Sequence, residues 1–220
     1  MKRIALFGIV LIAILFFSGC ATETQTPPAQ DSKPIEEPKT TPTPEEKPVE
    51  VPKTDTQTIV WKADGIITQN EYKNSNEFGN GRFTVYWSND DDYLYMGLKG
   101  QSSGWVSIGF EPTFAMQDSD MVFGWVRSGT PTVLDIYSTG AFGPHPPDQD
   151  LGGTNDLIEA GGSEAGGFTI IEFKRKLSTG DKYDKSFAKA QNINIIWGLG
   201  SSDSLESPHT TRGSGTIKLD

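Results

Sequence analysis

Apolar residues in the last three quarters of the chain alternate with a period of two. Every second residue from Phe83 to Trp87 is apolar, and residues 94–98 and 193–199 repeat the pattern. Successive side chains point to opposite faces of a β-strand, so this period predicts strands with one buried face. The residues concerned are mostly aromatic and β-branched, which fit a pleated surface well.

Clusters of turn-forming residues separate these runs at short intervals. They are 79–81, 88–92, 102–104, 128–131 and 161–167, each rich in Gly, Ser, Asn or Asp. Short strands with a turn cluster every 8–12 residues or so are typical of an antiparallel sandwich. The sequence therefore predicts an all-β domain, an antiparallel β-sandwich of about ten strands.

The N-terminus has the composition of an export signal. Lys2 and Arg3 precede an apolar stretch from Ile4 to Phe17, and small residues follow it. A positive start, an apolar stretch and a small-residue cleavage site predict a signal peptide over residues 1–19. An uncleaved membrane anchor is the alternative. Both interpretations place the rest of the chain outside the cytoplasm.

Cys20, the only cysteine, follows this segment directly. The segment resembles the lipobox of bacterial lipoproteins, with Phe17 in place of the usual leucine, and the cysteine of that motif is lipidated. The resemblance implies a lipid anchor with two or more acyl chains, which suffices for stable attachment to a membrane. The expected localisation is extracytoplasmic and anchored to the cell membrane.

Residues 20–56 are expected to be the lipidated cysteine and a disordered linker. Eight of the 14 prolines fall in residues 21–56, which contain no aromatic residue. Such a composition cannot bury enough apolar surface to fold. Residues 57–220 hold all five tryptophans and have the size of one domain, expected to be monomeric.

Charge excludes one class of partner. Without Lys2 and Arg3 the chain keeps 17 basic and 29 acidic residues, a net charge of −12. An average field this negative does not suit nucleic-acid binding.

Common catalytic signatures are absent from the sequence. It has no phosphate-binding loop, no dinucleotide-binding glycine run, no zinc-type Cys/His spacing and no nucleophile elbow. His145 and His209 are the only histidines, which excludes a three-histidine metal site. Hydrolysis by a pair of carboxylates stays open, although no pair of acidic residues stands out in the sequence.

Two other groups of residues have plain interpretations. Residues 90–92, three aspartates, are expected to form a hairpin turn in preference to a calcium site, and Asp148 and Asp150 to be loop residues. The five tryptophans lie in apolar strands, which favours core packing over a carbohydrate-stacking face.

Several motifs occur in a characteristic order. They are Gly104–Phe110 (GWVSIGF), Ala115–Trp125 (AMQDSDMVFGW), Phe173–Leu177, Ile196–Gly198 and Pro208–Gly213 (PHTTRG). Together they resemble the DOMON family, which is related to the cytochrome domain of cellobiose dehydrogenase. The resemblance covers nearly all of residues 59–220 and implies an immunoglobulin-like β-sandwich.

The resemblance also implies a cofactor. In the haem-binding branch of the family, a methionine and a histidine ligate the iron; Met116 and His209 match these positions, and both are expected in loops at one end of the sandwich. Thioether and imidazole fill both axial positions, which suits electron transfer with a redox partner protein. Without a Cys-x-x-Cys-His motif, haem b is held non-covalently. Arg212 is the expected contact of a haem propionate, and Met121 is expected in the core.

Two alternatives remain open at the level of sequence. One is a carbohydrate- or small-ligand-binding β-sandwich module without haem. The other is a structural interaction domain.

Overall fold

The structure is a computed structural model that describes residues 60–220. The expected signal peptide (1–19), the lipidation site Cys20 and the linker to residue 56 lie outside the described residues. Between residues 60 and 220, no helix has the length and apolar character needed to cross a membrane.

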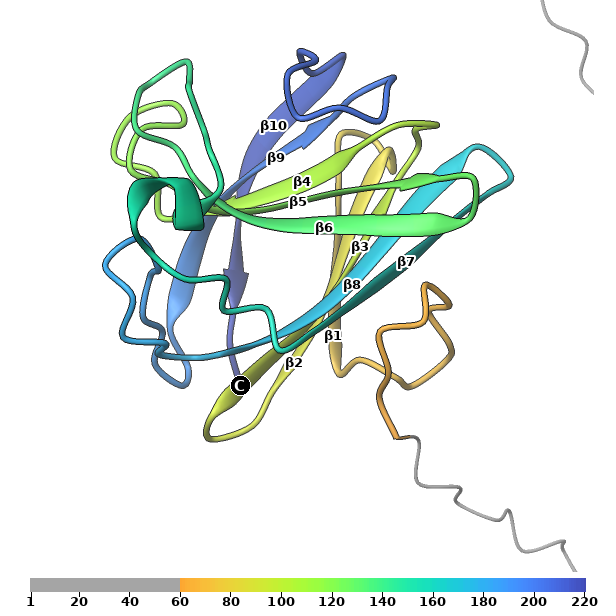
Figure 1. The fold of residues 1–220 in the computed structure, drawn as a ribbon. Helices are drawn as coiled ribbons and strands as arrows, with labels where there is room; N and C mark the ends of the chain where they lie inside the picture. The colour runs from red at the N-terminus through yellow and green to blue at the C-terminus, as the bar shows by residue number, and fades with distance from the viewer. Residues whose placement is uncertain (1–59) are drawn as a thin grey trace, which may run out of the picture. The chain divides into compact units, whose positions relative to one another are not determined.

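Ten strands form two five-stranded sheets, and every strand pairing is antiparallel (Figure 1). The first sheet has the order β1-β2-β3-β8-β7: β1 is Asn74–Phe78, β2 Phe83–Asn89, β3 Tyr93–Gly100, β8 Phe168–Lys176 and β7 Glu159–Ala165. The second has the order β10-β9-β4-β5-β6: β10 is Thr211–Lys218, β9 Asn192–Leu199, β4 Val106–Phe110, β5 Asp120–Arg127 and β6 Thr130–Tyr137. This confirms the predicted all-β sandwich.

The core lies between the two sheets and follows the period-two pattern. Phe83, Val85 and Trp87 of β2 are all buried in it. Phe83 stacks on Trp197 of the second sheet, with ring centroids 5.1 Å apart and planes at 10°. Full burial of one such side chain contributes about 1.5–3 kcal/mol. The hydrophobic effect therefore fixes which face of each strand points inward.

The second sheet has an apolar outer face as well. Every residue of β4 is buried, and alternate residues of β5 point to opposite faces. Val122 belongs to the core, whereas Met121 and Phe123 form a second cluster with Trp105 and Ile136. Because this cluster is buried too, the outer face is covered by protein.

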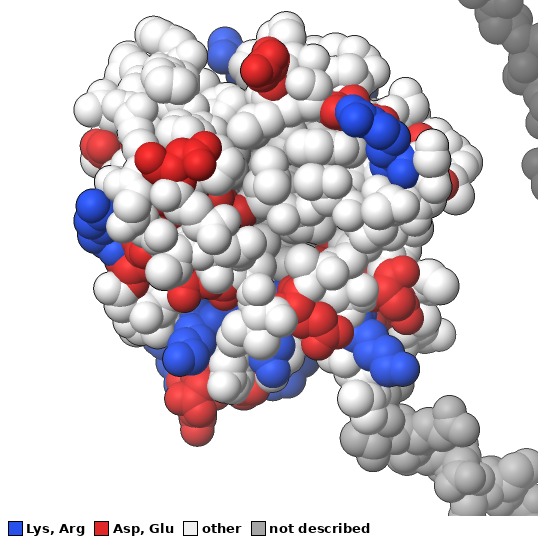
Figure 2. All heavy atoms as spheres, viewed as in Figure 1, with Lys and Arg blue, Asp and Glu red and all other residues white. Residues whose placement is uncertain are grey.

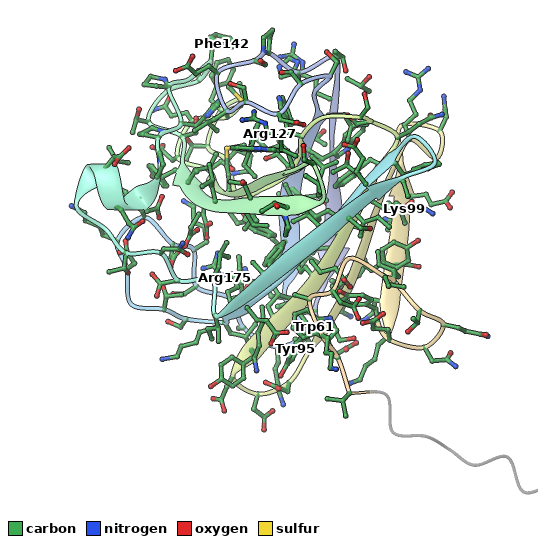
Figure 3. The ribbon with its side chains drawn as sticks, turned by 45° about the vertical axis from the view of Figure 1, so that its right-hand side comes forward. Trp61, Tyr95, Lys99, Arg127, Phe142 and Arg175 are labelled. Carbon is green, nitrogen blue, oxygen red and sulfur yellow. The ribbon has the colours of Figure 1, made fainter. Side chains whose placement is uncertain are left out.

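The tryptophan expectation is confirmed for only part of the set. Trp87 and Trp197 fill the core between the sheets. Trp105 and the half-buried Trp125 belong to the outer cluster instead. Trp61 is half-buried and lies edge-on to Tyr95, with ring centroids 5.2 Å apart (Figure 3).

The two aspartate groups have different outcomes. Asp90 forms the expected turn, in which its Oδ1 accepts hydrogen bonds from the backbone N–H of Asp92 (2.9 Å) and Tyr93 (2.7 Å). The loop expectation was wrong for both Asp148 and Asp150, which lie in a one-turn 3-10 helix, η1 (Asp148–Leu151). Asp150 is exposed, whereas Asp148 is only 1% exposed.

Candidate functional site

A cavity of about 820 Å³ lies on the outer face of the second sheet. Its floor comes from β4, β5, β9 and β10, and its walls come from three loops: 111–119, 138–147 and 200–210. Ligand pockets in proteins span roughly 300–1,000 Å³, so the cavity suits a molecule of cofactor size.

The floor of the cavity combines small residues with apolar side chains. Gly198 of β9 has the Trp105 ring so close that a Cβ there would lie 3.1 Å from it. Ser107 of β4 is 2% exposed, and its Oγ has no hydrogen-bond partner among the described residues. Beside these residues, Met121, Phe123 and Ile196 supply an apolar surface. The floor therefore suits a flat, mostly apolar ligand.

Met116 lies in the 111–119 loop and lines the cavity. Its backbone N–H donates to the Ala141 carbonyl (3.2 Å), and its own carbonyl accepts from the Ser119 N–H (3.1 Å). The residue before it, Ala115, has φ +52°, and Asp118 has φ +59°. Left-handed backbone at non-glycine residues costs on the order of 1 kcal/mol or more each, and such residues cluster at functional sites. The two backbone hydrogen bonds of Met116 fix its position within the loop.

His209 lies in the 200–210 loop and lines the same cavity. Trp105 holds this loop against β4, because its indole N–H donates to the Ser207 carbonyl (3.2 Å) and its backbone carbonyl accepts from the Gly200 N–H (2.9 Å). A Cβ at Gly200 would lie 2.1 Å from the Trp105 indole nitrogen, so only glycine fits there. The loop is fixed to the sheet on both sides of its tip.

Arg212, the third predicted residue, also lines the cavity. It lies on the exposed side of β10, and its Nη1 is 3.3 Å from Nε2 of His209. The structure therefore brings Met116, His209 and Arg212 to one cavity.

The expected placement of the loops at one end of the sandwich was wrong. Val106 of β4 pairs with Leu199 of β9, and Phe110 pairs with Ile195. Since the two strands run in opposite directions, the 111–119 loop leaves one end of the sheet and the 200–210 loop leaves the other (Figure 1). Met116 and His209 line one cavity because both loops fold over the outer face.

Sequence reasoning missed two features of the cavity. His145 lines it and stacks on Phe123, with ring centroids 6.2 Å apart and planes at 24°. Met121, buried as expected at 7% exposure, also faces it. The signal available for His145 was its position in a Gly-Pro-His-Pro-Pro segment, a rigid turn that points a side chain in a fixed direction.

The mouth of the cavity is aromatic. Phe142, 79% exposed, lies near the tip of the 138–147 loop (Figure 3). It lies edge-on to Phe114 of the facing loop, with ring centroids 6.5 Å apart. Charged residues of both signs are scattered over the face in Figure 2, without an extended basic patch in that view.

Comparisons with known proteins agree with this fold. Residues 79–200 match the DOMON domain model. The chain is 32% identical over 145 residues to DBH-like monooxygenase protein 1 of Mus musculus, which covers 63% of this chain and 22% of that protein. It is 31% identical over 125 residues to MOXD1 homolog 1 of Drosophila melanogaster, which covers 54% of this chain and 17% of that protein. The chain thus spans about a fifth of the length of these relatives.

A solved structure has a similar fold. The cytochrome b domain of pyranose dehydrogenase from Coprinopsis cinerea aligns with a TM-score of 0.50 and 14% sequence identity, over 66% of this chain and 80% of that one. At this level of identity the likeness concerns the fold.

Proposed function

The chain belongs to the DOMON domain family, and from this premise we propose that residues 60–220 bind haem b non-covalently and carry electrons. Met116 and His209 are the proposed axial ligands. The observation that carries the proposal is that both residues, 93 positions apart in sequence, line one cavity of cofactor size. The fold shared with a cytochrome b domain supports it.

The residues present fit the cofactor. Met121, Phe123 and Ile196 offer apolar contact for a porphyrin ring. Arg212 supplies a cation at the edge of the cavity for a propionate, which a guanidinium binds in a bidentate manner. The only cysteine is Cys20, so a c-type covalent attachment is excluded.

The ligand pair suits electron transfer. When bound, haem would supply one-electron chemistry. The Met116 thioether and the His209 imidazole would hold the iron, and this pair of ligands suits electron transfer. The protein's part is to hold both ligands and exclude water, and the proposed donor or acceptor is a redox partner protein.

This chain is proposed to be a carrier and not a catalyst. The relatives' names describe monooxygenases, but the chain spans about a fifth of their length. We further propose that Cys20 is lipidated, which would place the domain on the extracytoplasmic side of a membrane, where it meets its partner.

Reconstitution of the full chain with haemin tests the proposal. We expect a shifted Soret band and, on reduction, sharp low-spin α and β bands. His209→Ala should abolish haem retention or give a high-spin spectrum. His145→Ala is the matched control, because His145 lines the same cavity and should leave the low-spin spectrum unchanged. No Soret shift would refute haem binding and favour a carbohydrate or other small ligand; an effect of His145→Ala equal to that of His209→Ala would refute the ligand assignment.

A further inference from the structure

Four aspartates with buried side chains, from four different segments, lie near one another, and two of them pair with one buried arginine. Asp120 begins β5, Asp135 lies in β6, Asp148 begins η1 and Asp184 lies in the segment between β8 and β9. Their side chains are between 0% and 3% exposed. Carboxylate oxygens of Asp120, Asp135 and Asp184 lie within 4.8 Å of one another. Aspartates are rarely buried so completely without a positive partner.

Arg175 of β8 balances only part of this charge. Its Nη1 lies 2.6 Å from Oδ2 of Asp120, and its Nη2 lies 3.3 Å from Oδ1 of Asp184. Arg175 is itself 1% exposed and points inward from β8 (Figure 3). Four carboxylates against one guanidinium leave a deficit of positive charge in a site that water does not reach.

Several carboxylate oxygens in the cluster lack any partner. Oδ1 of Asp120, Asp135 and Asp148 is buried and accepts no hydrogen bond from the described residues. The second oxygen of two of these groups is fixed: the backbone N–H of Lys185 donates to Asp120 Oδ2, and that of Asp156 donates to Asp135 Oδ2, each at 2.8 Å. A buried charged oxygen without a partner is costly. Backbone hydrogen bonds therefore orient the Asp120 and Asp135 carboxylates, and Oδ1 of each has no partner among the described residues.

The raised pKa values of these carboxyl groups reflect the same deficit of positive charge. Burial, together with the neighbouring carboxylates, raises the pKa of Asp148 to about 8 and that of Asp135 to about 7. Burial raises the pKa of Asp184 to about 6. Near pH 7 the carboxylate form of Asp148 is therefore disfavoured, and Asp135 is divided between its protonated and ionised forms, unless a cation joins them.

We propose that Asp120, Asp135, Asp148 and Asp184 form a binding site for one Ca²⁺ ion. The donors are all oxygens, which hard divalent cations prefer to softer metals. Ca²⁺ binds oxygens at about 2.3–2.6 Å, so two of its ligands on opposite sides lie about 4.6–5.2 Å apart, which accommodates the spread of Asp120, Asp135 and Asp184. Asp148 is the proposed fourth ligand, because its carboxylate interacts electrostatically with those of the other three. Mg²⁺ at about 2.0–2.1 Å demands a tighter octahedron. The ion would replace the missing positive charge.

Ca²⁺ at this site would also stabilise one wall of the cavity, the 138–147 loop. Asp148 follows His145 and Pro146 in the chain, and both of those residues line the cavity. Pro147 makes a bridge with Ile136, next to Asp135. Ca²⁺ would therefore tie the 138–147 loop to β5 and β6. The ion-binding site is separate from the cavity, so its test does not depend on haem.

Calcium titration of the full chain tests the inference. The protein is stripped with EDTA, desalted and titrated with CaCl₂ by isothermal calorimetry, and its thermal unfolding is recorded in parallel. We expect saturable binding of one ion per chain and a melting temperature raised by several degrees, with a smaller rise in MgCl₂ and none in NaCl of equal ionic strength. Absence of saturable heat and of a melting shift at millimolar CaCl₂ would overturn the proposal and indicate that protons alone neutralise the cluster.

Matched variants locate the site. Asp135→Asn removes one charge with little change of shape and should weaken Ca²⁺ binding at least about tenfold, because affinity follows the number of charged ligands. Asp148→Asn should do the same and serves if the first variant does not fold. Asp150→Asn, on the exposed side of η1, should leave binding unchanged. If Asp150→Asn weakens binding as much as the other two, Ca²⁺ binds at the surface and the assignment is wrong.

Discussion

Arg212 Nη1 lies 3.3 Å from Nε2 of His209. A guanidinium can only donate hydrogen bonds, so Nε2 accepts and carries a lone pair. The proton of the neutral imidazole is then on Nδ1, and Nε2 is in the form that ligates a metal. Haem binding would transfer the Nε2 lone pair to iron and free Arg212 for a propionate.

Arg212 should therefore matter for haem affinity and not for spin state. Arg212→Gln removes the charge and should weaken haem retention roughly tenfold, the value of one charge-assisted hydrogen bond. The low-spin spectrum should persist, because both axial ligands remain. Haemin titration followed at the Soret band measures this. Arg82→Gln, in the exposed turn between β1 and β2, is the control and should change nothing; equal weakening by both variants would mean that Arg212 acts only through overall charge.

Met116 should set the reduction potential. Met116→Ala should retain some haem through His209 but lower the potential, since thioether ligation favours ferrous iron. Spectroelectrochemical titration of the reconstituted protein measures the shift. A Met116→Ala protein with an unchanged potential would exclude this residue as a ligand and direct attention to Met121, which faces the same cavity.

Met121 should mainly contribute stability. It is 7% exposed and packs with Trp105, Phe123 and Ile136. Truncation of a buried methionine costs about 2–5 kcal/mol. Met121 adjoins an existing cavity, so Met121→Ala enlarges that space instead of opening a closed void, and we expect the lower end of this range. Urea unfolding at equilibrium measures it; a loss well below 1 kcal/mol would contradict the packing role.

The sequence predicted the fold well because burial of one face of a strand produces a local alternation of apolar and polar residues. The alternation from Phe83 to Trp87 records which side chains meet the core. The continuous apolar run from Met121 to Val126 is compatible with a strand buried on both faces, but it does not show which segments cover the outer face of the second sheet. That distinction depends on loops distant in sequence.

The candidate site was predictable in its residues but not in its geometry. Family motifs indicated Met116, His209 and Arg212, which the structure brings to one cavity. No sequence motif indicated the acidic cluster, because its aspartates are spread over 65 residues of sequence and Asp148 lies in a segment rich in proline and glycine. Only the pairing of β5 with β6 and the position of η1 bring them together.

Cys20 should decide where the protein resides. If the cysteine is lipidated, Cys20→Ala should release or mislocalise the protein, because no acyl chains can be attached at that position. Membrane fractionation with a carbonate wash measures this, and circular dichroism of the released protein should stay β-rich. A Cys20→Ala protein that remains in the washed membranes would instead support an uncleaved N-terminal helix.

Stability without Ca²⁺ should fall as the pH rises. The folded-state pKa values of Asp184, Asp135 and Asp148 are raised to about 6, 7 and 8, whereas an unfolded aspartate titrates near about 3.9. Between these limits the folded state binds more protons than the unfolded state, so the free energy of unfolding decreases with pH. The stabilisation is complete below about pH 4 and is lost progressively up to about pH 8.

Urea unfolding of EDTA-treated protein at pH 5 and pH 8 should therefore give a lower free energy of unfolding at pH 8, and saturating CaCl₂ should reduce the difference. Asp135→Asn should lessen the fall, because one titrating group is gone. Higher stability of the EDTA-treated protein at pH 8 than at pH 5 would show that these carboxylates are ionised in the folded state without a cation.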